Sequence, residues 1–236
     1  MTGDITLKNV CKRFDTKRGY FEILKNINFT LHAHEITVLL GKSGCGKTTL
    51  LRLIGGLDRD YSGEIIFSNP EKNPEKTAIV FQEPRLMPWL TVEKNIAFGL
   101  KRGEIDHEKI RELLSLTGLT AFAHMKPAQL SGGMEQRTAL ARALAVEPGF
   151  LLMDEPFAAL DYFTRASMQK SLLDICRKRK RGVLFITHSI DEAFVLGDRI
   201  AVLRDKEIRK VYPLTENLRR DSGALENLKA DILDNI

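Results

Sequence analysis

The sequence predicts an α/β protein whose core is a mainly parallel β-sheet covered by helices. One observation is that apolar, strand-like runs at residues 36–40, 150–153, 183–187 and 199–203 alternate with helix-compatible stretches, as in a parallel sheet. Another is that residues from about 84 to 145 have helical spacing and no convincing strand. We therefore expect the 236 residues to form one α/β domain with a helical subdomain inserted at about 84–145.

The N-terminal part is expected to form an antiparallel β subdomain. Residues 4–10 and 21–31 alternate apolar and polar side chains, and the basic segment 12–19 between them is predicted to be a turn. A further strand is expected at residues 62–67, followed by turn residues at 69–73.

The C-terminal segment is expected to be a terminal helix that docks on the domain. Beyond Pro213 it is charged, apart from a short apolar stripe formed by Leu225, Leu228 and Ile232. The densest basic run, residues 177–181, is interpreted as the solvated end of a helix rather than a binding patch.

Composition is that of an ordinary soluble globular domain, because 43% of the residues are hydrophobic and 28% are charged. The net charge of +5 suits an anionic partner such as a nucleotide or a membrane face, but is too small to imply nucleic acid. The three cysteines, Cys11, Cys45 and Cys176, have no metal or disulfide spacing. No signal region and no run near the ~18 apolar residues of a membrane span is visible, so we expect a soluble, cytoplasmic protein.

The most specific motif is the glycine-rich segment 41–49. It matches the phosphate-binding pattern G-x-x-x-x-G-K-[ST] and lies between a predicted strand and a predicted helix starting near Thr49. Its backbone N–H groups would face a phosphate, Lys47 would reach the β- and γ-phosphates, and Thr48 would bind Mg²⁺. The expected nucleotide-binding residues of the loop are Gly41, Lys42, Ser43, Gly44, Cys45, Gly46, Lys47, Thr48 and Thr49.

Polar residues follow the other predicted core strands, at the sheet edge where ligands bind in open α/β folds. Gln82 follows a short strand at 77–81, Asp154 and Glu155 follow the run F-L-L-M, and His188 follows V-L-F-I-T. Because successive strand side chains point to opposite faces, Asp154 is assigned to the Mg²⁺ shell and Glu155 to polarising the attacking water as general base.

A second anion site is predicted at Leu130-Ser131-Gly132-Gly133, where Ser-Gly-Gly precedes an alanine- and leucine-rich helix. The serine hydroxyl and the free N–H groups of the helix start point to the same place. This segment lies far along the chain from the phosphate loop.

Together these motifs resemble those of the ATPase subunit of an ABC transporter, over essentially the whole chain. The resemblance implies a P-loop NTPase with a RecA-like parallel-sheet core. L-S-G-G-M is similar to the signature motif, F-L-L-M-D-E to the Walker B motif, Gln82 to the Q-loop glutamine and His188 to the switch histidine. Residues 159–161 (A-L-D) resemble the D-loop, and Phe14 resembles the aromatic residue that stacks on adenine, with Tyr20 and Phe21 as weaker candidates.

What the resemblance implies is a head-to-tail dimer that sandwiches two ATP molecules. Ser131 and Gly133 of one copy would contact the γ-phosphate held by the other, with Gly132 and Asp161 also at the nucleotide. Gln82 would contact the metal and couple the nucleotide to the helical subdomain, where transmembrane permease subunits dock. Glu155, His188 and Lys47 would be the catalytic residues.

The features F-Q-E-P-R-L-M-P-W-L and D-E-P-F-A-A-L-D resemble importers of nitrate, sulfonates and taurine. This implies a peripheral protein at the cytoplasmic face of the cell membrane, served indirectly by an extracytoplasmic solute-binding protein, with no nucleic-acid partner. The alternatives are an exporter or lipid-extraction ATPase, and a soluble non-transport ATPase of the same fold. A non-hydrolysing cassette is disfavoured because Glu155 and His188 are present. The preference for ATP over GTP and the position of Trp89, exposed or buried, stay open.

Overall fold

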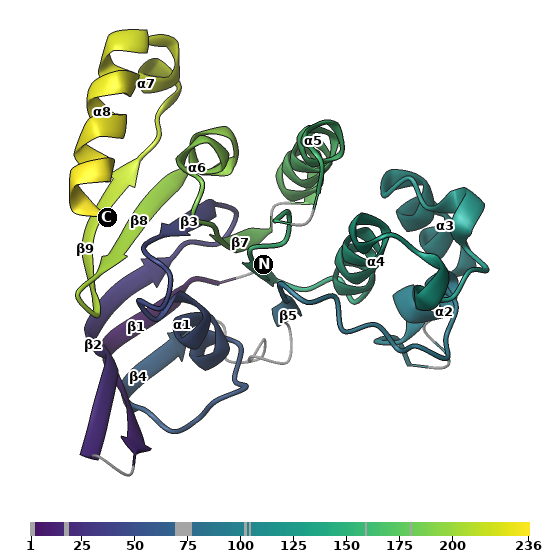
Figure 1. Ribbon diagram of the computed structural model, residues 1–236, viewed down its shortest axis with the longest axis horizontal. Helices are drawn as coiled ribbons and strands as arrows, with labels where there is room; N and C mark the ends of the chain where they lie inside the picture. Colours follow the sequence, from purple (N-terminus) through teal and green to yellow (C-terminus); the bar gives the residue numbers. More distant parts are fainter. Residues whose placement is uncertain are drawn as a thin grey trace.

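The computed structural model describes residues 3–16, 19–68, 77–101, 103, 105–158, 160–179 and 181–236. Its centre is a six-stranded sheet in the order β5-β6-β7-β3-β8-β9 (Figure 1). The strands are β3 (Ile36–Leu40), β5 (Thr77–Val80), β6 (Phe150–Asp154), β7 (Gly182–Ile186), β8 (Arg199–Arg204) and β9 (Glu207–Pro213). All neighbours are parallel except β8 and β9, which confirms the predicted mainly parallel sheet.

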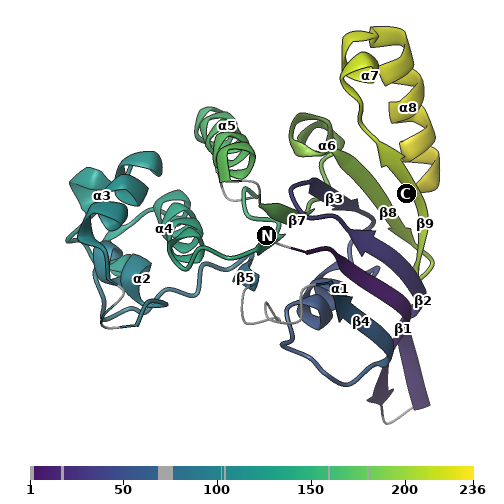
Figure 2. The same ribbon diagram turned by 180° about the vertical axis from the view of Figure 1, so that it is seen from behind.

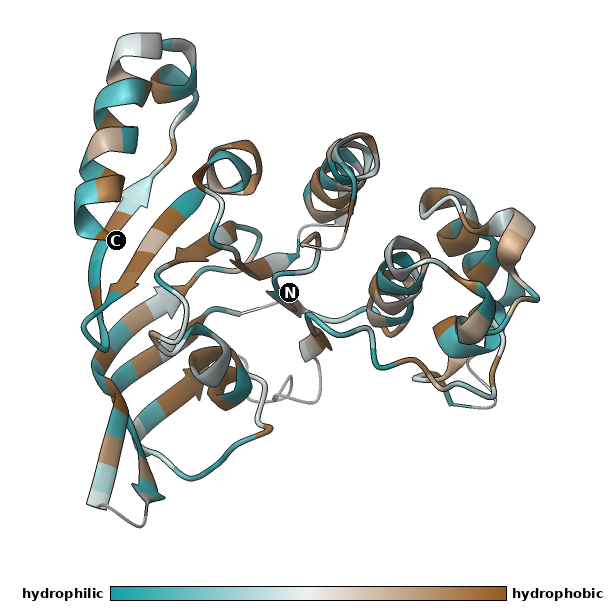
Figure 3. Cartoon of the chain, in the orientation of Figure 1, coloured by the Kyte–Doolittle hydropathy of each residue, from teal (hydrophilic) through white to brown (hydrophobic). Residues whose placement is uncertain are grey.

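The central strands are apolar throughout because both of their faces are covered. Every residue of β3, β6 and β7 is buried, as expected of a parallel sheet between two layers. Alternate residues of one strand join different cores: Val38 packs with the cluster on the α4, α5 and α6 side, whereas Leu39 packs with α1 and the N-terminal sheet. Figure 3 shows the apolar residues gathered along these strands.

The N-terminal sheet is antiparallel, in the order β2-β1-β4, and consists of β1 (Ile5–Thr16), β2 (Gly19–Leu31) and β4 (Ser62–Phe67). The predicted turn at 12–19 is wrong, because β1 continues to Thr16. Lys12 is tolerated inside this strand because its buried ammonium pairs with Asp58 at 3.0 Å and Asp60 at 3.1 Å. The turn expected at 69–73 lies outside the described residues.

A separate group of helices lies beyond β5, on the far side from α1 (Figures 1 and 2). It consists of α2 (Val92–Ala97), α3 (His107–Leu116), the 3₁₀ turns Thr120–Phe122 and Pro127–Gln129, and α4 (Gly132–Ala145). The described part of residues 84–145 contains no strand. Ile96, Ile110 and Leu140 pack in its interior, continuous with the main core.

The remaining helices are α1 (Lys47–Ile54), α5 (Tyr162–Arg179), α6 (Ile190–Leu196), α7 (Glu216–Arg220) and α8 (Ser222–Asn235). The predicted terminal helix is confirmed: α8 lies along β8 and β9 (Figure 1), and Ile232 on it is fully buried in the main core. In the described ranges, no helix is both long and apolar enough to cross a bilayer.

Candidate nucleotide-binding site

The phosphate loop joins β3 to α1, and its glycines are required by its backbone. Gly44 and Gly46 have φ angles of 77° and 110°, in the region that favours glycine. A Cβ atom on Gly41 would lie 2.4 Å from the Leu203 carbonyl oxygen. The buried Lys47 side chain folds back over the loop and donates hydrogen bonds to the carbonyl oxygens of Gly41 (2.7 Å) and Lys42 (2.9 Å). The helix begins at Lys47, two residues before the predicted start.

A hydroxyl and a carboxylate lie close together where α1 begins and β6 ends. The Thr48 hydroxyl donates a hydrogen bond of 2.8 Å to the Asp154 carboxylate. Burial raises the pKa of Asp154 above its ordinary value, although the Thr48 hydrogen bond and the nearby Lys47 ammonium oppose the rise. Hydroxyl and carboxylate oxygens are the donors that Mg²⁺ prefers, completed by phosphate and water. The described residues contain no cluster of three or more His, Cys, Asp or Glu suited to a metal.

Glu155 directly follows the last residue of β6, and its backbone leaves the extended conformation there. Its φ of 45° is left-handed, an uncommon and strained conformation for a non-glycine residue, and its N–H donates to the Ile186 carbonyl at 3.0 Å. The Glu155 Oε2 atom lies 3.1 Å from His188 Nδ1. The His188 side chain is 70% exposed, so the ring faces the surface while contacting the carboxylate.

Part of the phosphate loop, Gln82 and the two carboxylates line one cavity of about 200 Å³. Its lining is Ile23, Ser43, Gly44, Gly46, Lys47, Thr48, Thr49, Gln82, Asp154 and Glu155. A smaller hollow of about 80 Å³ adjoins it through Glu155 and includes His188. The structure therefore brings the predicted phosphate loop, Gln82, the two carboxylates and the histidine together.

Ile23 was not expected at the cavity. It lies on β2, and a Cβ on Gly46 would be 3.3 Å from its Cγ1 atom, so β2 borders the phosphate loop. Phe14, the predicted adenine-stacking residue, is not in the cavity lining. It lies on the neighbouring β1, 42% exposed, with the Lys12 ammonium 4.9 Å from its ring centre.

The predicted second anion site does not line this cavity. Ser131 is exposed and begins α4, where its Oγ atom accepts a hydrogen bond from the Met134 N–H at 3.3 Å. Figures 1 and 2 both place α4 apart from α1. Asp161 is also exposed, and the Leu160 side chain approaches Gly133. Ala159 lies outside the described residues.

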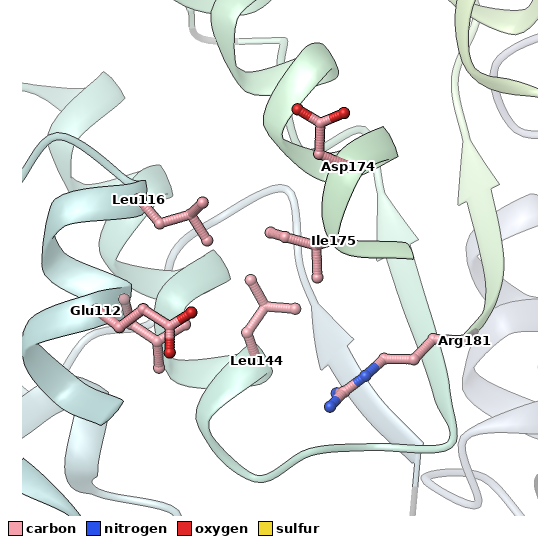
Figure 4. Close-up of a pocket in the computed structure, with 7 residues that line it drawn as sticks. Glu112, Leu116, Leu144, Asp174, Ile175 and Arg181 are labelled. Carbon is pink, nitrogen blue, oxygen red and sulfur yellow. The ribbon is translucent and has the colours of Figure 1, made fainter. Parts of the chain in front are cut away.

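Two surface expectations are also resolved. Trp89, for which exposure and burial stayed open, is 66% exposed. At the two ends of the basic run 177–181, Arg177 is exposed, whereas Arg181 is buried and its guanidinium points toward a second cavity of about 190 Å³ (Figure 4). That cavity lies between α3, α4 and α5 and is lined by Glu112, Leu113, Leu116, Leu144, Asp174, Ile175 and Arg181.

Comparison with known proteins agrees with this geometry. A family model described as "ABC transporter" matches residues 24–158. The aliphatic sulfonates import ATP-binding protein SsuB of Bacillus thuringiensis subsp. konkukian (strain 97-27) is 41% identical, over 97% of this chain and 94% of that protein. The aliphatic sulfonates import ATP-binding protein SsuB 2 of Pseudomonas syringae pv. tomato (strain ATCC BAA-871 / DC3000) is 43% identical, over 89% of this chain and 90% of that protein.

Two solved structures have the same fold at 35% identity, each covering 89% of this chain and 99% of the other. They are the dimer of MJ0796, described as a bacterial ABC transporter cassette, with a TM-score of 0.82, and the MJ0796 dimer in a post-hydrolysis state with ADP and phosphate, with a TM-score of 0.81. The predicted P-loop NTPase fold is thus confirmed, and the chain belongs to the ABC transporter family of ATP-binding domains.

Proposed function

We propose that this chain is the ATP-hydrolysing subunit of an importer for aliphatic sulfonates or a similar small anion. The observation that carries the proposal is the shared cavity, where Lys47, the Thr48–Asp154 pair and Glu155 meet beside His188. The substrate class comes from the relatives, whose names describe aliphatic sulfonate import.

In this proposal the phosphate loop holds the triphosphate. Lys47 exchanges part of its bonding to the loop carbonyls for the β- and γ-phosphates, and the N-terminus of α1 adds backbone donors. Thr48, Asp154 and Gln82 would hold Mg²⁺, either directly or through water. When bound, Mg²⁺ would neutralise charge on the phosphate oxygens.

The carboxylate of Glu155 then accepts a proton from the attacking water as general base. A general base has to lie within hydrogen-bond reach of its water, and Glu155 lines the same cavity as the phosphate-binding residues. His188 contacts this carboxylate at 3.1 Å and would orient it and the γ-phosphate. Phe14, on the strand that neighbours β2, would stack on the base.

The catalytic unit is proposed to be a head-to-tail dimer of this chain. Ser131 is exposed and Gly133 is half-buried, neither lines the cavity of its own phosphate loop, and the helix α4 that Ser131 begins lies apart from α1 (Figure 1). They would therefore cover the γ-phosphate of a second copy, with Gly132 and Asp161 at the same face. The similar solved cassettes are dimers.

The helical subdomain, residues 84–145 approximately, would be the docking site for transmembrane permease subunits. The exposed Trp89, directly after Pro88 and close to Gln82 in the chain, supplies an aromatic contact for that partner. The protein would then work as a peripheral subunit at the cytoplasmic face of the membrane, with an extracytoplasmic solute-binding protein delivering the anion.

The test is reconstitution of the chain with its permease in lipid vesicles, with the solute-binding protein added outside. We expect ATP hydrolysis to be stimulated by an alkanesulfonate–binding-protein complex and by neither component alone. Nitrate and taurine test the wider class of small anions, and maltose, a neutral sugar, is the negative control. Stimulation by a hydrophobic compound without any binding protein would contradict the importer and favour an exporter.

A further inference from the structure

Glu192 is a nearly buried carboxylate that the proposed hydrolysis does not use. It lies on α6, and only 8% of its surface is exposed. A buried charge is costly unless it is paired and hydrogen-bonded. Here both carboxylate oxygens have partners: Oε2 accepts from the Thr187 hydroxyl at 2.5 Å, and Oε1 accepts from the Gln169 amide at 3.3 Å.

Glu192 is hydrogen-bonded to the residues on both sides of His188 in the chain. The Thr187 Oγ1 atom that donates to Glu192 also accepts the Ser189 N–H at 3.1 Å. The Ser189 Oγ atom in turn accepts the Glu192 N–H at 3.3 Å and begins α6. Thus the residues immediately before and after His188 are both tied to Glu192.

His188 needs such an anchor because its own side chain is mostly exposed. Within the part of the chain that the structure describes, its ring makes one polar side-chain contact, with the Glu155 carboxylate at 3.1 Å. Because this one contact alone does not fix the ring, its position depends on the position of the His188 backbone. A displacement of about 1 Å at a catalytic group can cost on the order of 100-fold in rate.

The same carboxylate is also linked to the segment before Asp161. Arg165 and Gln169 are one turn apart on α5, so both face α6. The Arg165 Nε atom lies 3.9 Å from Glu192 Oε1, an ionic contact, and its Nη2 atom donates to the Leu160 carbonyl at 3.0 Å. Leu160 packs next to Gly133 at the start of α4.

We infer that Glu192 is a positioning residue for ATP hydrolysis: it fixes the 187–189 backbone so that His188 faces Glu155, and through Arg165 it links that backbone to the Leu160–Asp161 segment. The inference rests on the proposed function, since it gives Glu192 a purpose only if His188 and Glu155 act in hydrolysis. Glu192 itself lies in the hollow beside the phosphate cavity and does not line the cavity that would hold phosphate.

The test substitutes Glu192→Gln, which preserves shape but removes the charge and places an amide donor among donors. We expect kcat to fall roughly tenfold or more, because a small displacement of His188 from Glu155 slows the reaction, while the Kd for ATP changes by less than about twofold because no phosphate contact is lost. The matched control is Asp191→Asn, the adjacent exposed carboxylate paired with Lys229, for which kcat stays at the wild-type value.

A double-mutant cycle separates positioning from general destabilisation. In a His188→Ala background, Glu192→Gln should cause no further loss of kcat, because the residue it positions is gone. A multiplicative loss in that background, or a full wild-type kcat in the single variant, overturns the inference. If Glu192→Gln does not fold, as judged by circular dichroism, Arg165→Gln at the half-exposed edge of the cluster carries the same expectations.

His188→Ala alone distinguishes the two levels of failure. If it hydrolyses ATP at the wild-type rate, the proposed role of His188 fails, and the role of Glu192 fails with it. If it is slow while Glu192→Gln and Arg165→Gln are both normal, only the inference about Glu192 fails.

Discussion

Replacing Glu155 with glutamine is the sharpest perturbation of the proposed hydrolytic site. The side chain stands at the end of β6 in a left-handed backbone conformation, lines the phosphate cavity, and contacts His188 at 3.1 Å. Glutamine keeps the size and the hydrogen-bonding reach of the side chain. It removes only the ability to accept a proton and the negative charge.

The expected size of the effect follows from the role of a general base, which contributes roughly 10²–10⁴-fold to a rate, or about 2.7–5.5 kcal/mol of activation free energy. Turnover should fall by at least the lower figure. ATP binding should be kept or strengthened, because Lys47 and the loop N–H groups are unchanged and a negative charge next to the triphosphate is removed. The ATP-bound dimer should therefore accumulate.

The assay combines three measurements on the same preparation: phosphate release, the Kd of a fluorescent ATP analogue, and the molar mass by light scattering with and without ATP. Glu226→Gln, an exposed position on α8, is the control and should match the wild type in all three. A Glu155→Gln variant that hydrolyses ATP at the wild-type rate would refute the general-base assignment.

Three further predictions concern the second half-site, the metal pair and the C-terminal helix. Ser131→Arg should prevent the ATP-dependent dimer seen by light scattering while one copy still binds ATP; loss of that binding would mean that Ser131 serves its own chain. Asp154→Asn should abolish Mg²⁺-dependent turnover yet raise Tm at neutral pH. Burial raises the pKa of Asp154 above its ordinary value, so the protonated carboxyl does not destabilise the fold below the ordinary pKa, whereas the ionised carboxylate destabilises it as pH rises through the folded pKa. The Tm values of the wild type and the variant should therefore differ at neutral pH and converge below about pH 4. Ile232→Ala removes a fully buried side chain at a cost of roughly 2–5 kcal/mol, lowering Tm by about 2–4 °C for each kcal/mol in calorimetry, with unchanged hydrolysis per folded molecule.

The fold was predictable where burial on two faces makes a strand apolar along its whole length, as in β3, β6 and β7. It was not predictable where contacts with residues distant in the chain, rather than the local sequence pattern, determine the structure. Lys12 looks like a turn residue, but Asp58 and Asp60 neutralise it within β1. The strand β9 (Glu207–Pro213) was missed because it pairs only with β8 at the sheet edge, where charged residues are common.

The lining of the candidate site was predictable where the proposed chemistry requires a particular residue type next to a strand end. Lys47, Thr48, Gln82, Asp154 and Glu155 all reach the cavity. Ile23 was not predictable, because it reaches the cavity only through the packing of β2 against the glycine-rich loop.

The connections of Glu192 bear on why hydrolysis would depend on a second copy. Asp161 is exposed at the face proposed to meet the partner chain, whereas His188 contacts the proposed general base. Leu160, Arg165, Glu192 and Thr187 form a continuous series of contacts between the two. Contact of a partner chain with the Asp161 segment would therefore affect the position of the backbone next to His188 within the same chain. On this reasoning Arg165→Gln should leave ATP-dependent dimerisation in the Glu155→Gln background intact and still slow hydrolysis when Glu155 is present, a combination that simple weakening of the dimer would not produce.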